Sequence, residues 1–469
     1  MANIIEVIPP EILASIFETV IYSCGITSIL PISLVCTAWR DIIDHTPRLW
    51  GIILFEKHTP PHILHSQISK AKAAPLSVTI PVRLGRKHQE IISRLTSLSH
   101  NWVSAEVSIQ HLIYNSPEDA YCNLETLVLS RGRPQKSLGV GEESPTKSAQ
   151  IVSKPTFVHP AKLHSFSAIG IGRSWVLPFL SFSIRHFRLR QKGDILQNMH
   201  DLERYLVRIP QLVTLELDHF YFSNPLMRSE HSSTILLRNL EVLRLTNMSY
   251  SPAILCALTV PSLQLLTISA LPLLWDSTYY VWIPASFRRY KPTPMAPLFS
   301  QWSQDGIIPA NLHTLELHNC LLPGDISYLI RWLARLPNLV SLSLKDDGVH
   351  RSMIIPPDVA RQFYDSLALP QPRIDSDEAV WICPSLTILH LEIANRFLTD
   401  LLPIAQSRGK GASPIHGILP PKQLRRVEAQ ICPLGVDKVE ERILFDSLIE
   451  QPYCICHNFG LGLGCMGAA

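Results

Sequence analysis

A short apolar phrase, Leu-x-x-Leu-x-Leu, recurs along most of the chain. Its spacing places alternate apolar side chains on one side of an extended segment, so each copy predicts a short, half-buried strand. The clear copies begin at Leu124, Leu212, Leu240, Leu263, Leu312, Leu339 and Leu386, and degenerate copies begin at Leu163, Ile184 and Leu424. Copies that start at 184, 212, 240 and 263 are 28, 28 and 23 residues apart. This period indicates an array of stacked structural repeats.

The segments between the copies favour helices. Apolar residues from Ile326 to Leu336 recur at helical spacing, Asp325 precedes them and Pro337 follows them. We therefore expect Asp325 to cap a helix that ends before Pro337. The segment from Met199 to Ile209 repeats this pattern. Each repeat is then a helix, a proline and a short strand, and such units stack into a curved solenoid whose strands line the concave side.

The N-terminal fifty residues follow a different pattern. Pro9, Pro10 and Glu11 open a helix with an apolar stripe, because proline is suited to the first turn and a carboxylate to the positive end of the helix dipole. Two further short apolar segments follow Gly25, so we expect three helices. A domain this small cannot bury all of that apolar surface by itself. The leftover apolar face predicts a partner.

Three motifs in this region resemble the F-box, most closely the F-box-like form common in large fungal families. They are Ile8-Pro-Pro-Glu-Ile-Leu, Leu34-Val-Cys-Thr-Ala-Trp-Arg and Thr46-Pro-Arg-Leu-Trp. Isoleucine replaces the usual leucine of the opening Leu-Pro. The resemblance implies docking onto the Skp-type adaptor of a cullin-based SCF ubiquitin ligase. The family's docking positions fall on Pro9, Ile12, Leu13, Ile16, Phe17, Leu34 and Val35. Trp39 and Trp50 are expected mainly in the helical core. A helical cap that closes the neighbouring domain has the same apolar periodicity and stays an alternative.

The repeats fit the period of leucine-rich repeats. Cys320 and Cys432 occupy the ninth position of their copies, as the leucine-rich-repeat pattern prescribes, but most copies lack that residue. We therefore expect an α/β fold: a small three-helix F-box domain at 1–55, then an irregular leucine-rich-repeat horseshoe. The horseshoe is expected to span 56–450, with insertions near 131–156 and 270–310, and an apolar, Gly-rich tail at 451–469.

Alternation along the strands also assigns a substrate face. The Leu positions point inward, so the residues between and after them point into the concavity. The substrate-face residues are Thr214, Glu216, Asp218, Arg244, Thr314, Glu316, His318, Lys345, His390 and Glu392, with Val242, Thr246, Ser341, Ser343 and Ile388 in the same rows. This mixed-charge face suits recognition of a protein by charge complementarity. An ordinary solvated sheet surface has the same pattern.

Composition and motifs argue against several classes of function and location. The net charge is +3 and only 17% of residues are charged, which gives no support to nucleic-acid binding. A cluster at 288–291, Arg-Arg-Tyr-Lys, suits single-stranded nucleic acid but stands alone, so a solvated loop is the expected interpretation. Prolines interrupt the longest uncharged runs, so we expect no membrane span. Glu11 and Glu18 stand where a signal peptide needs apolar residues, and ten scattered cysteines suit a reducing compartment. We expect a protein of the cytoplasm, the nucleus or both.

No catalytic motif for phosphate, dinucleotide, zinc-protease or serine-hydrolase chemistry is present in the sequence. The tail residues Cys454, Cys456, His457 and Cys465 are the best metal candidates, but their Cys-x-Cys spacing is shorter than zinc sites usually use. We expect no enzymatic activity, no cofactor and no metal. The chain is interpreted as the substrate-recognition subunit of an SCF ligase. A non-ligase scaffold that uses the same repeat surface is the alternative, and a hydrolase hidden in the solenoid is a third class.

Overall fold

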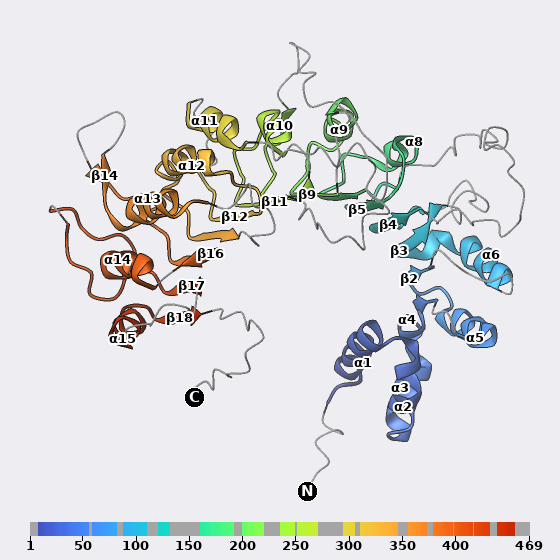
Figure 1. Ribbon diagram of the computed structural model, residues 1–469. Helices are drawn as coiled ribbons and strands as arrows, with labels where there is room; N and C mark the ends of the chain where they lie inside the picture. The colour runs from blue at the N-terminus through green and yellow to red at the C-terminus, as the bar shows by residue number, and fades with distance from the viewer. Residues whose placement is uncertain are drawn as a thin grey trace, which may run out of the picture. The chain divides into compact units, whose positions relative to one another are not determined.

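The computed structural model describes residues 8–55, 59–81, 88–109, 121–131, 160–191, 199–219, 235–248, 251–270, 294–304, 310–345, 355–372, 379–396, 398–415, 417–431 and 439–454. The chain forms two compact units, Met1–Gly193 (unit 1) and Asp194–Ala469 (unit 2). Unit 1 begins with helices and continues into a parallel sheet, and unit 2 is a mixed α/β unit with a larger parallel sheet (Figure 1).

The N-terminal helices of unit 1 are α1 (Pro10–Cys24), α2 (Ile29–Ser33), α3 (Thr37–His45) and α4 (Pro47–Trp50), with a 3₁₀ turn at Ile26–Ser28. The helix α1 begins with proline and has Glu11 in its first turn, as expected. It ends at Gly25, whose φ of 82° is readily adopted only by glycine. The third expected helix is two helices, because Pro47 cannot continue α3 but is well suited to start a new helix.

These helices enclose a small apolar core. It consists of Leu13, Phe17, Ile21, Ile26, Ile29, Ile43, Leu49 and Ile52. Trp39 and Trp50 are half-buried and pack against this core from outside. The Trp39 ring lies 4.9 Å from the Phe17 ring, and Trp50 Nε1 donates to the Ile43 carbonyl at 2.9 Å. Because Ile52 belongs to β1, the helical core includes the first strand of unit 1.

The sheet of unit 1 contains β1 (Ile52–Leu54), β2 (Leu76–Thr79), β3 (Trp102–Ser108), β4 (Thr126–Ser130), β5 (Ser165–Ile169) and β6 (His186–Arg190). Each strand pairs in parallel with the next. Its helices are α5 (Pro61–Ala71), α6 (Gln89–Ser97) and the short α8 (Arg173–Val176), with 3₁₀ turns at Ser99–Asn101 and Leu177–Phe179. The first three strands lack the leucine phrase, so the sequence pattern did not predict them.

The sheet of unit 2 contains β7 (Thr214–Asp218), β9 (Val242–Met248), β11 (Leu265–Ala270), β12 (Thr314–His318), β13 (Ser341–Lys345), β16 (Ile388–Arg396), β17 (Arg426–Ile431) and β18 (Gln451–Cys454). Neighbours in this order pair in parallel. Two further short pairs join β8 (Ile235–Leu236) to β10 (Leu258–Thr259) and β14 (Gln371–Pro372) to β15 (Ala379–Val380).

The helices of unit 2 are α9 (Met199–Leu206), α10 (Ser251–Cys256), α11 (Ala296–Gln304), α12 (Ile326–Leu333), α13 (Pro357–Ala368), α14 (Leu398–Arg408) and α15 (Val439–Leu448), with a 3₁₀ turn at Pro323–Asp325. Successive helices from α10 to α15 pack against each other. Figure 1 shows these helices on one side of the unit 2 strands. On the opposite side of the sheet, the described strands present polar side chains such as Glu216 of β7 and Arg244 of β9.

Every copy of the leucine phrase forms a strand that starts two residues after the first apolar residue, which confirms the strand prediction. The apolar positions of the phrase are buried, as at Leu315 and Leu317 of β12. Strand after strand pairs without a shift over the central residues, for example Leu215 with Leu243. This register places equivalent positions of successive copies in straight rows across the sheet.

Three expectations are corrected. Asp325 does not cap α12; its buried carboxylate accepts hydrogen bonds from the backbone N–H groups of Leu322 and Ala296, at 2.8 and 2.7 Å, and so ties the start of α11 to the turn before α12. The expected insertion near 270–310 contains α11, which packs beside α12. The tail expected from residue 451 begins with β18, which pairs with β17.

Other expectations fall on residues outside the described ranges. These are most of the 131–156 insertion, the Arg-Arg-Tyr-Lys cluster at 288–291, and the tail residues Cys456, His457 and Cys465. No helix within the described residues is long and apolar enough to cross a membrane.

A buried arginine braces the segment that leads into β16. Arg408 at the end of α14 is 0% exposed and donates to the carbonyl of Leu367 at 2.6 Å, to that of Cys383 at 3.1 Å and to that of Ile382. Burial lowers the pKa of its guanidinium to about 10, so the group stays charged at neutral pH. These hydrogen bonds hold α13 and the turn before β16 to α14.

Candidate functional site: exposed apolar helices and a charged sheet face

The helix α1 buries one side and exposes another. Leu13, Ala14, Phe17 and Ile21 face the helical core. Ile12 and Ile16 lie four residues apart on the opposite side and are 53% and 47% exposed. Two large apolar side chains at helical spacing, turned to solvent, are costly to hydrate. They form one part of a candidate contact surface.

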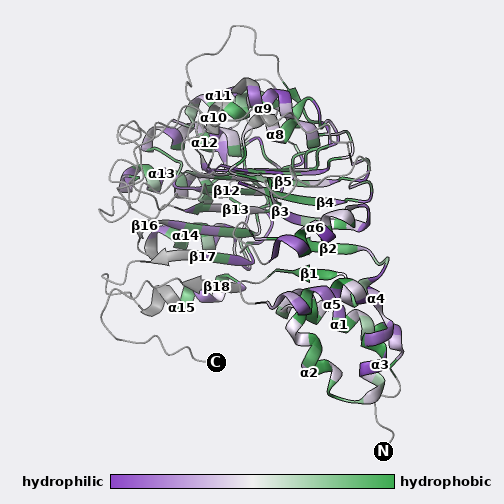
Figure 2. Cartoon of the chain, turned by 90° about the vertical axis from the view of Figure 1, so that its right-hand side faces the viewer, coloured by the Kyte–Doolittle hydropathy of each residue, from purple (hydrophilic) through white to green (hydrophobic). Residues whose placement is uncertain are grey.

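A second exposed apolar segment follows α2. Leu34 and Val35 are 74% and 55% exposed. Their backbone N–H groups donate to the carbonyls of Pro31 and Ile32, each at 3.2 Å, so the turn that presents them is held by α2. Figure 2 colours α2 as largely hydrophobic. We call the exposed set of Pro9, Ile12, Ile16, Leu34 and Val35 the apolar face.

Two of the seven residues assigned to docking by resemblance lie elsewhere. Leu13 is 6% exposed and Phe17 is 2% exposed, and Phe17 packs against Trp39. They fall on the side of α1 that faces the core, so in this structure they support the fold and are not available for direct contact. The other five residues are exposed.

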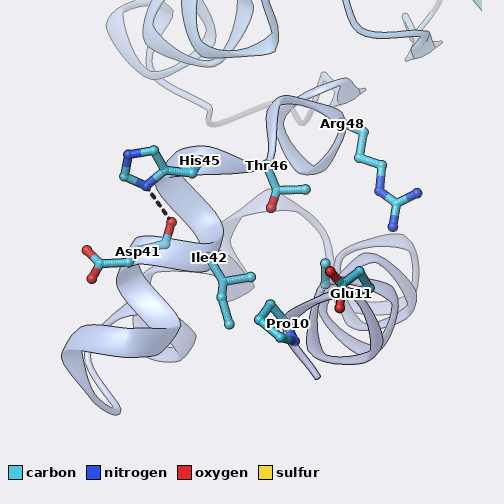
Figure 3. Close-up of a pocket in the computed structure, with 8 residues that line it drawn as sticks. Pro10, Glu11, Asp41, Ile42, His45, Thr46 and Arg48 are labelled. Carbon is cyan, nitrogen blue, oxygen red and sulfur yellow. Dashed lines mark hydrogen bonds between the residues drawn. The ribbon is translucent and has the colours of Figure 1, made fainter. Parts of the chain in front are cut away.

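An open cavity of about 590 Å³ lies between α1 and α3. Pro10, Glu11 and Ala14 line it from α1, and Asp41, Ile42 and His45 line it from α3, with Thr46 and Arg48 beyond. Figure 3 shows Ile42 directed toward Pro10, with Glu11 on the α1 side. The cavity therefore has an apolar base and carboxylates on both sides. Arg48 approaches Glu18 of α1 at 3.8 Å.

Comparison with known families identifies this region. Residues 5–56 match the F-box-like family. The match covers the four N-terminal helices and β1, and therefore both segments of the apolar face. F-box domains generally bind Skp1-type adaptors in SCF complexes. A search of curated proteins finds no match for the chain.

Beyond the F-box-like region, the polar strand positions of unit 2, on the side of the sheet opposite the buried leucines, form a second candidate surface, the polar face. It comprises Thr214, Glu216, Asp218, Arg244, Thr246, Thr267, Thr314, Glu316, His318, Ser341, Ser343, Lys345, His390, Glu392, Arg426 and Glu428. Register places these residues in three rows, and the central row runs from Glu216 through Arg244, Thr267, Glu316 and Ser343 to His390 and Glu428. Within a row, neighbours on adjacent parallel strands are close enough to bond.

Charges on the polar face are paired across strands. Arg244 donates to Glu216 at 2.7 Å, Thr267 donates to Glu316 at 2.9 Å, and Lys345 donates to Glu392 at 3.2 Å. Hydrogen bonds from His390 and Lys345 outweigh the effect of burial and hold the pKa of the Glu392 carboxyl below its usual value. The pKa of His318 is also lowered, chiefly by burial.

Asp218 is the most enclosed acid of the polar face, with 8% exposure. Its Oδ1 contacts His219 Nδ1 at 2.7 Å and accepts hydrogen bonds from Thr246 at 3.0 Å and Asn247 at 2.9 Å. Burial alone would raise its pKa, but these hydrogen bonds prevail and hold the pKa far below the usual range. Asp218 therefore belongs to a structural network at the end of β7 and β9, rather than to an open binding surface.

The structure therefore brings part of the sequence-based substrate face together and buries another part. The structure brings Glu216 together with Arg244, and Lys345 together with Glu392 and His390. It encloses Asp218, and Ser343 is also buried. Sequence analysis missed the buried Thr267, and it missed Arg426 and Glu428, although the degenerate copies at Leu163, Ile184 and Leu424 included their strand and alternation places both residues on the polar side of β17.

Proposed function

We propose that this chain is the substrate-recognition subunit of an SCF ubiquitin ligase and has no catalytic activity of its own. The observation that carries the proposal is the match of residues 5–56 to the F-box-like family, together with the exposure of Ile12, Ile16, Leu34 and Val35 within it. Apolar side chains that a domain leaves in water gain the most when a partner covers them. The adaptor is expected to cover the apolar face.

The rest of the chain is proposed to be a divergent leucine-rich-repeat horseshoe. In-register parallel strands with helices on one side support this architecture. A further regularity lies at the eighth position of the phrase, where His219, Asn247 and Asn319 adopt positive φ angles of 55°, 53° and 51°. At the ninth position of the copy that begins at Leu312, the Cys320 thiol donates to the Ile268 carbonyl of the preceding strand at 3.8 Å. A turn with the same geometry therefore ends several strands.

The polar face of unit 2 is proposed to bind the target protein. Its side chains stand on the side of the sheet that the helices leave uncovered, and its charges vary along each row. Such a surface selects a partner by complementarity of charge more than by the area buried. We place this activity in the cytoplasm, the nucleus or both, in keeping with scattered cysteines in a reducing compartment.

The test is affinity capture of the full chain followed by mass spectrometry. The wild-type chain is expected to capture a Skp-type adaptor, a cullin and further proteins. The double variant Ile12→Ala/Ile16→Ala is expected to lose adaptor and cullin and to keep the further proteins. Ile443→Ala is the matched control, because this isoleucine of α15 is 64% exposed but lies in unit 2. Capture of the adaptor by the double variant at the wild-type level would refute the proposed docking face.

A second comparison examines the polar face. Glu216→Lys/Glu316→Lys reverses two half-buried acids on the strands, and Asp365→Lys reverses an exposed acid on α13 as the control. Loss of the further proteins in the first variant alone supports substrate binding by the polar face. Retention of all of them, with the adaptor still bound, places substrate recognition elsewhere. Capture of further proteins without adaptor or cullin by the wild-type chain favours the alternative function, a scaffold outside any ligase.

A further inference from the structure

One histidine on the polar face lies between two carboxylates. His390 of β16 contacts Glu392 of its own strand through Nε2, at 2.6 Å, and Glu428 of β17 through Nδ1, at 2.5 Å. The side chains of these three residues, the His390 trio, are only 15%, 23% and 13% exposed. His390 and Glu428 are also direct partners in the β16–β17 register. The imidazole ring therefore links the two strands above their backbone hydrogen bonds.

The hydrogen-bond chemistry of this arrangement requires an additional proton. A neutral imidazole has one N–H and one lone pair, whereas an ionised carboxylate only accepts hydrogen bonds. A neutral ring between two carboxylates would therefore direct one lone pair at an oxygen lone pair. Both contacts are favourable only if both ring nitrogens carry protons or one carboxyl group is protonated.

Neighbouring cations bond to both carboxylates of the trio. Lys345 donates to Glu392, and the pKa of the Glu392 carboxyl lies below its usual value because the bonds from His390 and Lys345 outweigh the effect of burial. Arg426 donates to Glu428. The geometry of the trio thus calls for one proton more than a neutral imidazole and two carboxylates carry.

We propose that the His390 trio is a proton-binding site that closes the β16–β17 junction when it is protonated and loosens it when the proton leaves. Loss of the proton removes one charge-assisted hydrogen bond and leaves two carboxylates beside a neutral ring. It also makes the polar face more negative by one charge at this point. Protein stability at this junction, and the surface that a partner meets, then depend on pH.

Other charged groups define the surroundings of the trio. Lys345 of β13 bonds to Glu392, and Arg426 of β17 bonds to Glu428. On the far side of β17, the backbone of Tyr453 in β18 pairs with Glu428. His318 of β12 interacts electrostatically with Glu392 and His390, and with Glu316 of its own strand, and burial lowers its pKa. The glutamine variants described below separate a response of the trio from a response of His318.

The test is hydrogen exchange of the full chain at about pH 6 and about pH 8, corrected for the intrinsic pH dependence of exchange. In the wild-type chain, protection of Ile388–Arg396 and Arg426–Ile431 is expected to fall on the order of tenfold or more at the higher pH. Thr314–His318 of β12 is the internal reference and is expected to keep its protection. This inference goes beyond the proposed function, since its readout requires no partner.

Glutamine variants separate proton binding from simple packing. In Glu428→Gln, the side-chain amide can donate to the ring lone pair, so a neutral His390 has a partner at both nitrogens and protection should no longer depend on pH. Glu392→Gln makes the same change at Nε2 and should have the same effect, which keeps the test valid if one variant does not fold. Arg361→Gln is the control, because Arg361 of α13 pairs with Asp400 of α14, so this variant leaves the trio and its two cationic partners in place and should retain the wild-type response. An identical pH response in wild-type and glutamine variants, or no response in the wild type, would overturn the proposal.

Discussion

The N-terminal helices and the strands of unit 2 expose opposite kinds of surface. The helices leave Leu34 74% exposed and Ile12 53% exposed. The strands expose acids and bases that pair with one another, such as Glu216 with Arg244. Apolar side chains in water are stabilised only when contact with another apolar surface removes them from the solvent. The paired charges of the polar face already bond to each other, so this surface is stable in water without a binding protein.

This difference teaches how each surface can be used. An apolar surface attracts most partners of suitable shape, so its specificity rests on the fold that displays it. A paired polar surface discriminates, because a wrong partner leaves buried charges without their hydrogen bonds. We therefore expect substitutions in the helices to change affinity or folding strongly. Substitutions on the polar face are expected to change specificity and pH dependence with small changes in stability.

The largest expected effect lies in the core behind the apolar face. Phe17→Ala removes a ring that is 2% exposed and packs 4.9 Å from Trp39, and should lower the free energy of unfolding of the helical region by about 3–5 kcal/mol. Limited proteolysis should show rapid cleavage within the first sixty residues, and adaptor binding should be lost with the fold. Wild-type protease resistance combined with lost binding would instead make Phe17 a contact residue.

The next largest effect concerns binding without unfolding. Leu34→Ala should weaken adaptor binding by about 2–4 kcal/mol if this leucine is an anchor of the interface, while the free energy of unfolding changes by less than about 0.5 kcal/mol. Binding is measured by calorimetry with a purified Skp-type adaptor, and stability by thermal unfolding. Leu419→Ala is the matched control, because Leu419 is 76% exposed in unit 2 and Leu34 is 74% exposed. Equal affinities of the two variants would remove Leu34 from the docking face.

A smaller effect is expected at Asp218, where the polar face has its most enclosed acid. Asp218→Asn should cost about 1–3 kcal/mol at neutral pH, since it disturbs the bonds from His219, Thr246 and Asn247. Because the pKa of folded Asp218 lies below its value in the unfolded chain, the carboxylate stabilises the protein above about pH 4 and this stability is lost as the pH falls further. Thermal unfolding from neutral to acidic pH should therefore decline more steeply for the wild type than for the variant. Parallel pH profiles would show that the carboxylate charge is not involved.

The smallest effect is expected for the exposed pair on β7 and β9. Side chains of Arg244 and Glu216 are 45% and 24% exposed, and such pairs usually couple by about 0.2–1 kcal/mol. A double-mutant cycle with Arg244→Gln and Glu216→Gln should give a coupling free energy in this range that declines at high salt. Coupling well above this range would mean that the polar face is stabilised by its charges, and would weaken the contrast with the helices.

Local pattern in the sequence was enough to predict the strands that carry the leucine phrase and the start of α1. The leucine phrase specifies which side of a strand is buried, because side chains alternate along any extended segment whatever surrounds it. Pro10 and Glu11 predicted where α1 begins for the same local reason. The strands β1 to β3 escaped prediction because they lack the phrase, and their burial comes from neighbours distant in sequence.

Resemblance placed the F-box-like region correctly but could not sort its apolar residues. Leu13 and Ile16 are equally apolar in the sequence, and only the packing of α1 against α3 and α4 decides that Leu13 is buried and Ile16 is exposed. The same applies to Asp218, which alternation assigns to an open face. Its enclosure depends on Asn247, which lies 29 residues further along the chain.

The sequence by itself determined the periodic features of this protein: where the strands that carry the leucine phrase form, which of their side chains face the core, and that an F-box-like segment precedes these strands. Tertiary structure alone decided which polar residues meet. His390 and Glu428 are 38 residues apart in the sequence, and their contact exists because β16 and β17 pair in one particular register. Backbone pairing over long loops sets such contacts, and no local pattern encodes the register between two strands.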